Sequence, residues 1–241
     1  MTLRETVQRC TEAVERGELL EVGVVNAAKI VKMRNDRALH EAVTGCDVIV
    51  ADGQSVVWAS RVLRQPLPER VAGIDLFQAL LRVAEEQGRS VYFLGARQDV
   101  LDAMIDRVRR QHPDLLIAGS HHGYYRDDEA PAIADGIKGS GADLLFLGMT
   151  SPKKEIFVAT HGLRTGARVV HGVGGSFDVL AGVVRRAPRL WQRMGCEWLY
   201  RALQEPRRLG RRYLTTNVTF IGLVVREWAR STLPTRRGES N

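Results

Sequence analysis

The sequence predicts an α/β fold, a Rossmann-like parallel sheet flanked by helices, with a basic helical C-terminal appendage. Three observations predict it. Short runs of β-branched and apolar residues alternate with segments of helical period, polar residues and glycines follow those runs, and arginine accumulates late in the chain. Hydrophobic residues make up 44% of the 241 and charged residues 26%, which excludes a disordered chain. We expect an α/β catalytic core over residues 1–184 and the appendage over 185–241.

Six apolar runs are predicted to form the strands of the sheet, and four segments between them have a helical period. The predicted strands are residues 21–26, 47–52, 90–95, 115–119, 143–149 and 168–173. The predicted helices are residues 28–43, 74–87, 98–111 and 153–163. Near-continuous apolar strands separated by helices are typical of a parallel sheet covered on both faces.

Polar residues and glycines follow five of these strands. They are Asn26, Asp52 with Gly53, Gly95, Gly148, and the cluster 172–175. Turns favour Gly and Asp for backbone reasons alone. In open α/β sheets, however, ligands bind at the carboxyl ends of the strands. Five such coincidences at one edge predict a nucleotide or sugar pocket.

Asp52 has two interpretations. It ends the apolar run VIVA, where a partly desolvated carboxylate can act as a general base on a hydroxyl. Alternatively it caps the helical stretch that follows Gly53. Spacing alone leaves both open.

The segment 148–155 also has two interpretations. A glycine-bearing turn enters a helix through Pro152, which leaves free N–H groups and two lysines as a seat for a phosphate. Alternatively Ser151 is the helix N-cap and Lys153 and Lys154 are exposed.

Several common site types are absent from the sequence. It contains no GxxxxGK[ST] phosphate loop, no GxSxG elbow and no HExxH. The cluster 172–175 fails GxGxxG because Phe177 stands where the third glycine belongs. No Asp-x-Asp pair is present, so we expect neither a metal nor a cofactor. The three cysteines lie far apart, and the chain shows neither a signal peptide nor an apolar run long enough to span a bilayer, so we expect a cytoplasmic protein.

The excess positive charge lies at the end of the chain. Residues 185–241 hold thirteen arginines, no lysine and four glutamates, a net charge of +9, whereas residues 1–184 carry −2. Three of the four tryptophans, Trp191, Trp198 and Trp228, lie in the same stretch. Such a segment suits a surface of phosphates, either anionic lipid headgroups or nucleic acid. Residues 190–202 have an amphipathic pattern, which also fits a terminal helix docked on the core, and we predict a surface-seeking helix over 211–231.

Several phrases together resemble one family. They are Asp52-Gly53 with Asn26, Arg70 to Leu76, Phe93-Leu-Gly95, His122-Gly-Tyr124, Ser151 to Glu155, Gly172 to Asp178, Arg186-Ala-Pro188, Glu197 to Arg201, Glu205 to Arg208, and Arg212-Tyr213. From about residue 20 to 213 the chain is similar to the WecG/TagA/CpsF glycosyltransferases, called family 26. Members of that family transfer a sugar from a UDP donor to a polyprenyl-diphosphate-linked glycan, for common antigen, teichoic acid or exopolysaccharide.

The resemblance implies roles for particular residues. The Asp of the strand-end Asp-Gly, here Asp52, is the base of an inverting, metal-independent transfer, and arginines stabilise the UDP leaving group. The catalytic candidates are Asp52, Asn26, Lys154 and Arg70. The candidates for substrate binding are Gly53, Gly95, Tyr124, Gly148, Ser151, Gly174, Gly175, Asp178, Arg201, Arg208 and Arg211.

The resemblance also implies that the appendage docks on the inner face of the membrane and completes the site. Two departures from the family pattern lie at the expected sugar or phosphate site: Val24 stands where a Thr is frequent, and Lys154 where a Gln is frequent. They favour an exopolysaccharide branch of the family over the N-acetylmannosamine branch. The sequence leaves a homo-oligomer open and predicts no specific nucleic-acid partner. The alternatives are a Rossmann-type oxidoreductase, which the failed glycine fingerprint disfavours, and a basic nucleic-acid binder.

Overall fold

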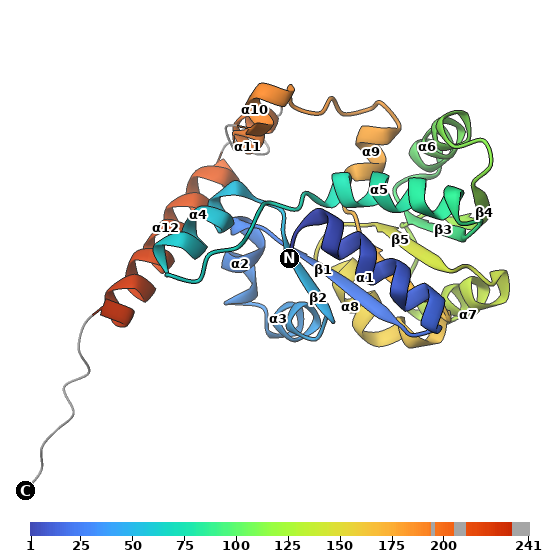
Figure 1. Ribbon diagram of the computed structural model, residues 1–241, viewed down its shortest axis with the longest axis horizontal. Coiled ribbons are helices and arrows are strands. Elements are labelled where there is room, and N and C mark those ends of the chain that lie inside the picture. The colour runs from blue at the N-terminus through green and yellow to red at the C-terminus, as the bar shows by residue number, and fades with distance from the viewer. Residues whose placement is uncertain (194–195, 205–210, 233–241) are drawn as a thin grey trace, which may run out of the picture.

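The computed structural model describes residues 1–193, 196–204 and 211–232, and its centre is a six-stranded parallel sheet (Figure 1). The strand order is β2-β1-β6-β5-β3-β4. The bounds are β1 (Leu20–Val25), β2 (Val48–Ala51), β3 (Ser90–Gly95), β4 (Leu116–His121), β5 (Leu144–Gly148) and β6 (Val169–Gly172). All six predicted strands are confirmed, and so is the α/β fold with helices on both faces.

Helices cover the two faces because successive strand residues point to opposite sides. Val91 and Phe93 pack on one side, with helices α1 (Leu3–Arg16), α5 (Gly73–Glu86), α6 (Gln98–Gln111) and α9 (Ser176–Leu180). Tyr92 and Leu94 pack on the other, with α7 (Ala130–Ser140) and α8 (Lys153–His161). The short 3₁₀ helices η1 (Asp127–Glu129) and η2 (Leu163–Thr165) flank α7 and α8 in sequence.

The predicted helix over 28–43 forms two helices, α2 (Ala27–Met33) and α3 (Arg37–Thr44). The break lies at Asp36, whose side chain accepts a hydrogen bond from the backbone N–H of Leu39 at 3.0 Å. This N-cap starts a second helix and turns the chain. Helix α3 then packs beside α8.

Four phenylalanines fill the centre of the core between the sheet and α5. Phe77 lies 4.6 Å from Phe146 and 5.8 Å from Phe177, measured between ring centroids, and Phe93 packs edge-on to Phe77. Each of the four is essentially fully buried. Burial of this aromatic area fixes α5 and α9 on the sheet and so positions the loops at its carboxyl edge.

The last helices are α10 (Arg189–Arg193), α11 (Glu197–Gln204) and α12 (Arg211–Thr232). The predicted helix over 211–231 is confirmed, and the amphipathic stretch 190–202 falls on α10 and α11 rather than on one helix. Helix α12 extends from the core along α2 and α4 (Gln54–Val62) (Figure 1). Phe220 is buried there against Ala27 and Ala59. The boundary at residue 184 stays a prediction.

Candidate active site

Asp52 lies at the carboxyl edge of the sheet, directly after β2. Its backbone N–H donates to the carbonyl of Val25, the last residue of β1, at 2.8 Å. Its carboxylate faces the start of α5, because a Cβ built on Gly73 would lie 3.8 Å from Asp52 Oδ2. The N-cap of α4 is Gly53, with no side-chain cap hydrogen bond. Asp52 is therefore not the N-cap residue of α4 but the residue before it.

Asn26 lies beside the Asp52–Gly53 turn. A Cβ built on Gly53 would be 3.5 Å from the Cβ of Asn26. The Asn26 side-chain oxygen accepts a hydrogen bond from the N–H of Lys29 at 3.0 Å and caps α2. Two of the four catalytic candidates thus lie together, and one of them also has a structural role.

Arg186 and Asp75 form a two-pronged ion pair near Asp52. Arg186 Nη1 lies 2.6 Å from Asp75 Oδ1, and Nη2 donates to Oδ2 at 2.8 Å. Burial disfavours the charged guanidinium, but the Asp75 hydrogen bond and charge outweigh it and raise the pKa of Arg186, with further contributions from Glu197 and Asp52. A geometrically fixed cation therefore lies within the electrostatic reach of Asp52.

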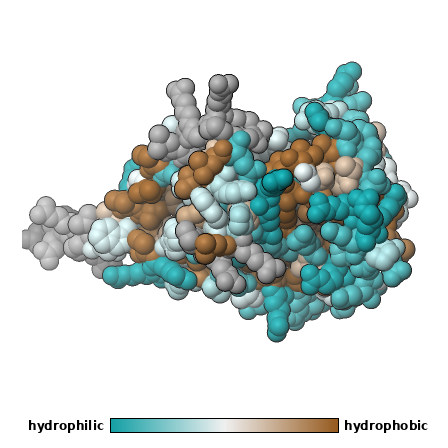
Figure 2. All heavy atoms as spheres, turned by 90° about the horizontal axis from the view of Figure 1, so that it is seen from above, coloured by the Kyte–Doolittle hydropathy of each residue, from teal (hydrophilic) through white to brown (hydrophobic). Residues whose placement is uncertain are grey.

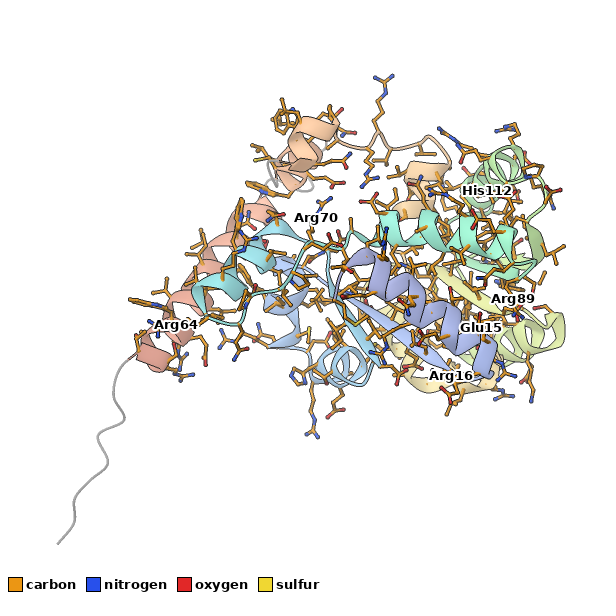
Figure 3. The ribbon with its side chains drawn as sticks, viewed as in Figure 1. Glu15, Arg16, Arg64, Arg70, Arg89 and His112 are labelled. Atoms are coloured by element: carbon orange, nitrogen blue, oxygen red, sulfur yellow. The ribbon has the colours of Figure 1, made fainter. Side chains whose placement is uncertain are left out.

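Arg70 connects the core to the C-terminal helices. Its Nη1 lies 3.1 Å from Glu197 Oε2, and both side chains are largely buried. Figure 3 shows Arg70 on the side of the core that faces α10 and α11. Glu197 begins α11, so this pair ties the loop before α5 to the first part of the predicted appendage.

Lys154 belongs to a buried cluster of three charged side chains. Its Nζ lies 2.6 Å from Glu155 Oε1, and Lys29 Nζ lies 2.7 Å from the same oxygen. Lys29 also donates to the carbonyl of Val24 in β1. Burial, followed by the charge of Lys29, lowers the pKa of Lys154 to about 8. The expectation of two exposed lysines is therefore wrong for Lys154, which is 7% exposed.

The alternative of Ser151 as an N-cap is also wrong. The N-cap of α8 is Pro152, and Ser151 Oγ is buried with no hydrogen-bond partner in the described part of the chain. Lys153 points toward the loop after β4, where its Nζ donates to the carbonyls of Gly123 at 3.2 Å and Tyr125 at 2.7 Å.

Tyr124 lies on that same loop and is 73% exposed. A Cβ built on its neighbour Gly123 would lie 3.0 Å from the Cα of Gly95, so the loop is seated against the end of β3. An exposed aromatic ring held at the carboxyl edge offers a flat face to a ring-shaped ligand.

The glycines that follow the strands have packing reasons of their own. A Cβ on Gly95 would overlap the backbone of Gly148, and a Cβ on Gly148 would overlap the ring of Phe177. Gly174 has φ +53°, a conformation that favours glycine, and open space around it. Gly175 is the N-cap of α9, close to the carboxylate of Asp178. Glycine at 95 and 148 lets the strand ends approach closely, and the space beside Gly174 is open.

The predicted arginines of the appendage are only partly described. Arg201 lies in α11 and Arg211 begins α12, but their side chains lie outside the described residues, as does all of Arg208.

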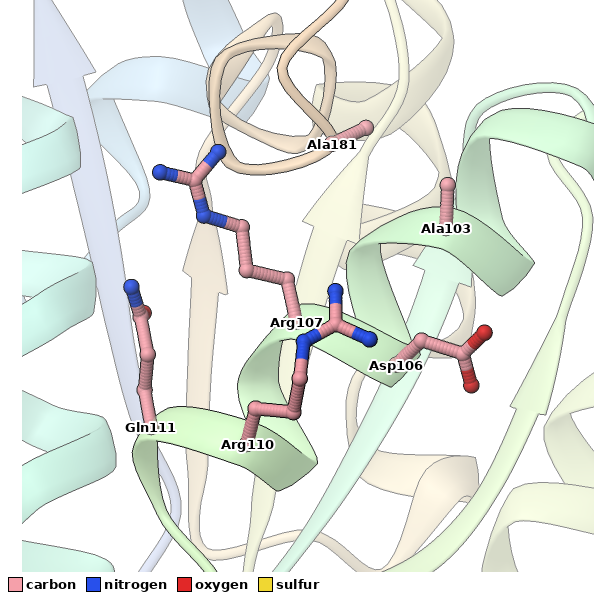
Figure 4. A pocket seen from close by; sticks show the side chains of 6 residues that line it. All are labelled: Ala103, Asp106, Arg107, Arg110, Gln111 and Ala181. Carbon is pink, nitrogen blue, oxygen red and sulfur yellow. The ribbon is translucent and has the colours of Figure 1, made fainter.

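Figure 4 shows a groove away from these candidates, of about 430 Å³, on the exposed side of α6. Arg107, Arg110 and Ala181 are among its lining residues. None of the residues predicted for the site lines it.

Four charged residues of this edge, Arg186, Asp75, Lys29 and Glu155, were not predicted as site residues. Arg186 and Asp75 were noticed only as parts of motifs, because sequence does not show that residues 111 positions apart form a pair. Lys29 gave no signal beyond its position three residues after Asn26.

A parallel sheet with helices on both faces and charged and polar groups at its carboxyl edge defines an α/β protein of Rossmann-like fold, a class whose members generally bind ligands at that edge. The family model for the glycosyl transferase WecG/TagA/CpsF family matches residues 1–233. The chain therefore belongs to this family of glycosyltransferases of cell-surface polysaccharide synthesis, as the motifs predicted. Within residues 1–193, 196–204 and 211–232, no helix is both long and apolar enough to cross a membrane.

Proposed function

We propose that the protein is an inverting, metal-independent hexosyltransferase. It moves a sugar from a UDP-sugar to a polyprenyl-diphosphate-linked glycan at the inner face of the cell membrane, as part of exopolysaccharide, common antigen or teichoic acid synthesis. The observation that carries the proposal is Asp52, whose carboxylate lies at the carboxyl edge, faces the start of α5 and is within the field of Arg186. Membership of the family supplies the reaction class.

The proposed step is a single displacement. Asp52 accepts the proton of the acceptor hydroxyl while that oxygen attacks the anomeric carbon of the donor sugar. The bond from the anomeric carbon to the β-phosphate oxygen breaks on the opposite face, and UDP leaves with the bonding electrons. Attack opposite the leaving group inverts the anomeric configuration.

The leaving diphosphate needs positive charge because it gains charge as the bond breaks. Arg70 is the described candidate in the core, and Arg201, Arg208 and Arg211 are the candidates in the C-terminal segment. The Arg70–Glu197 pair places α11 next to this position. This contact supports a site that is completed by the residues after 184.

Helix α12 supports docking on a bilayer. Val218, Ile221, Val225 and Trp228 are each 45–63% exposed, and their spacing places them on one side of the helix. The buried Phe220 faces α2 and α4 instead. Viewed from above, hydrophobic side chains gather over the C-terminal helices (Figure 2). An apolar stripe beside many arginines is typical of a helix that lies in the membrane interface.

The first experiment measures UDP binding by calorimetry with EDTA present, and then transfer from a panel of UDP-sugars to a lipid-linked acceptor. Asp52→Asn is expected to lower kcat by about 10²–10⁴-fold, because a general base is lost, while UDP still binds. Asp128→Asn, on the exposed η1, is the matched control. Full transfer by the Asp52 variant would disprove the base.

A second experiment measures sedimentation with vesicles that contain anionic lipid. The double variant Ile221→Asp, Val225→Asp is expected to lose most vesicle binding. Leu163→Asp, at a residue that is 84% exposed on η2, is the control and should bind as the wild type does. Unchanged binding by the double variant would remove α12 from the proposed docking surface.

A further inference from the structure

The Lys29–Glu155–Lys154 cluster joins three elements of the fold at the carboxyl edge. Lys29 comes from the first turn of α2, Lys154 and Glu155 from the first turn of α8, and Lys29 donates to the carbonyl of Val24 in β1. The aliphatic part of Lys154 passes over Gly172 at the end of β6, where a built Cβ would lie 3.1 Å from Lys154 Cε. The three side chains are only 8–9% exposed.

The cluster is unbalanced in charge. Two ammonium groups share one oxygen, Glu155 Oε1, at 2.7 and 2.6 Å. Burial of an uncompensated charge is costly, and it is tolerated where a ligand or partner supplies the opposite charge. One lysine would be enough to tie α2 to α8 through Glu155, so the second positive charge has no structural requirement in this contact.

The cluster also has unused hydrogen-bonding capacity. Among the described residues, Glu155 Oε2 and Ser151 Oγ are buried and have no hydrogen-bond partner. Buried polar atoms are nearly always paired, so an unpaired carboxylate oxygen on a side chain that is 8% exposed indicates a missing donor. A hydroxyl or amide group on a bound ligand would supply that donor.

The cluster lies close to the proposed base. A Cβ built on Gly73 would lie 3.8 Å from both Asp52 Oδ2 and the side chain of Val24. The backbone carbonyl of Val24 accepts a hydrogen bond from Lys29. Asp52 and Lys29 therefore both lie around Val24, at the end of β1.

We propose that Lys29, Lys154 and Glu155 form a subsite for an anionic oxygen group of the donor, with the excess cation binding the anion and Glu155 Oε2 accepting from a neighbouring hydroxyl or amide. The inference rests on the proposed nucleotide-sugar donor. The anionic group is either a carboxylate on the donor sugar or a phosphate of the nucleotide. Lys29 has no assigned role otherwise, and the two lysines act together as a specificity determinant.

The test compares the affinities of UDP, UDP-glucose and UDP-glucuronic acid for the wild-type chain, Lys154→Gln and Lys29→Gln. Glutamine is one atom shorter but keeps an unbranched stem and a polar end, and it removes one positive charge. Lys32→Gln is the matched control, because Lys32 is an exposed lysine on the same helix and, among the described residues, its Nζ donates to a backbone carbonyl, that of Ser151, rather than to a carboxylate. Unfolding temperatures establish that each variant is folded, and Lys29→Gln carries the test if Lys154→Gln does not fold.

A carboxylate ligand predicts that the wild type prefers UDP-glucuronic acid over UDP-glucose by about 10-fold. Lys154→Gln would abolish that preference and leave UDP affinity within about twofold. A phosphate ligand predicts a similar loss of about 10-fold for all three compounds. The proposal is overturned if folded variants at both lysines bind all three as the wild type does.

Failure of the wild type to bind UDP would count against the proposed donor and not by itself against the subsite. In that case the same proteins are heated with pyrophosphate or glucuronate. A rise in unfolding temperature that is present in the wild type and Lys32→Gln but lost in Lys154→Gln supports the anion subsite. The absence of any rise in the wild type overturns it.

Discussion

Two clusters of charged side chains lie at the carboxyl edge of the sheet, and they differ in balance and in exposure. Arg186 with Asp75 is a one-to-one pair whose side chains are 20% and 35% exposed. Lys29, Glu155 and Lys154 place two cations on one anion at 8–9% exposure. The first resembles an ordinary structural ion pair, whereas the second holds a positive charge in excess where water is scarce. The difference separates a balanced contact from one that, in our proposal, is completed by a ligand.

Glu155→Gln should have the largest effect on stability. The substitution leaves two buried ammonium groups facing each other, and breaking a buried pair costs about 3–5 kcal/mol. We expect the unfolding temperature to fall by about 10 °C, measured by circular dichroism. Glu41→Gln removes the partner of the exposed Arg37 and should change stability by less than about 0.5 kcal/mol. Equal stability of the two variants would remove the distinction between the clusters.

Asp75→Asn should have an intermediate effect. The amide keeps one hydrogen bond to Arg186 but loses the charge, and water reaches about a third of the Asp75 side chain. We expect a loss of about 1–2 kcal/mol in urea unfolding. A loss as large as that of Glu155→Gln would show that the exposure of an ion pair does not decide how much stability is lost when it is broken at this edge.

A last effect, comparable in size to that of Asp75→Asn, is a dependence of stability on pH that arises from Lys154. Its pKa is lowered to about 8, first by burial and then by Lys29, whereas in the unfolded chain it is near the ordinary lysine value. Between about pH 8 and 10 the unfolded state therefore binds more protons than the folded state, so stability should rise with pH in this window. Between pH 8 and pH 10 the unfolding free energy of the wild type should rise by about 1–2 kcal/mol relative to that of Lys154→Gln.

Three other titratable groups around the cluster have pKa values outside that window. Glu155 has its pKa lowered to about 2, a net result in which Lys154 and Lys29 outweigh the opposing effect of burial. Burial lowers the pKa of His171 to about 4 and raises that of Cys46, near Glu155 and Lys29, to about 12. If the difference in unfolding free energy between wild type and Lys154→Gln stays the same from pH 8 to pH 10, the lowered pKa of Lys154 is contradicted.

The strands could be predicted almost completely, because strand periodicity and apolar runs are local properties of the sequence. All six lie where they were predicted, whereas the helix over 28–43 was divided wrongly. Helices α1 and α7 and the order of the strands across the sheet were not predicted. The cap at Asp36 was visible in the sequence but was weaker than the helical period around it.

The site was predicted less completely because it depends on contacts between distant residues. Asp52 and Asn26 follow their strands, so their place at the edge could be read from position alone. The environment of Lys154 could not, since its burial depends on Lys29 from another helix and on the absence of a side chain at Gly172. The pair of Arg186 with Asp75 likewise depends on how the loop after α9 returns to α5.

The order of strands in the sheet has a consequence for biosynthesis. Strand β6 is the last to leave the ribosome, yet it lies between β1 and β5. Until residue 172 has emerged, the nascent chain can form only two half-sheets, β1 with β2 and β3 with β4 and β5, each with an unpaired edge. Such edges pair readily with other chains, and non-local pairing of this kind is slow. Insertion of β6 closes both edges in one event, so a fragment that ends before Val169 should aggregate, whereas one that ends after residue 184 keeps all six strands.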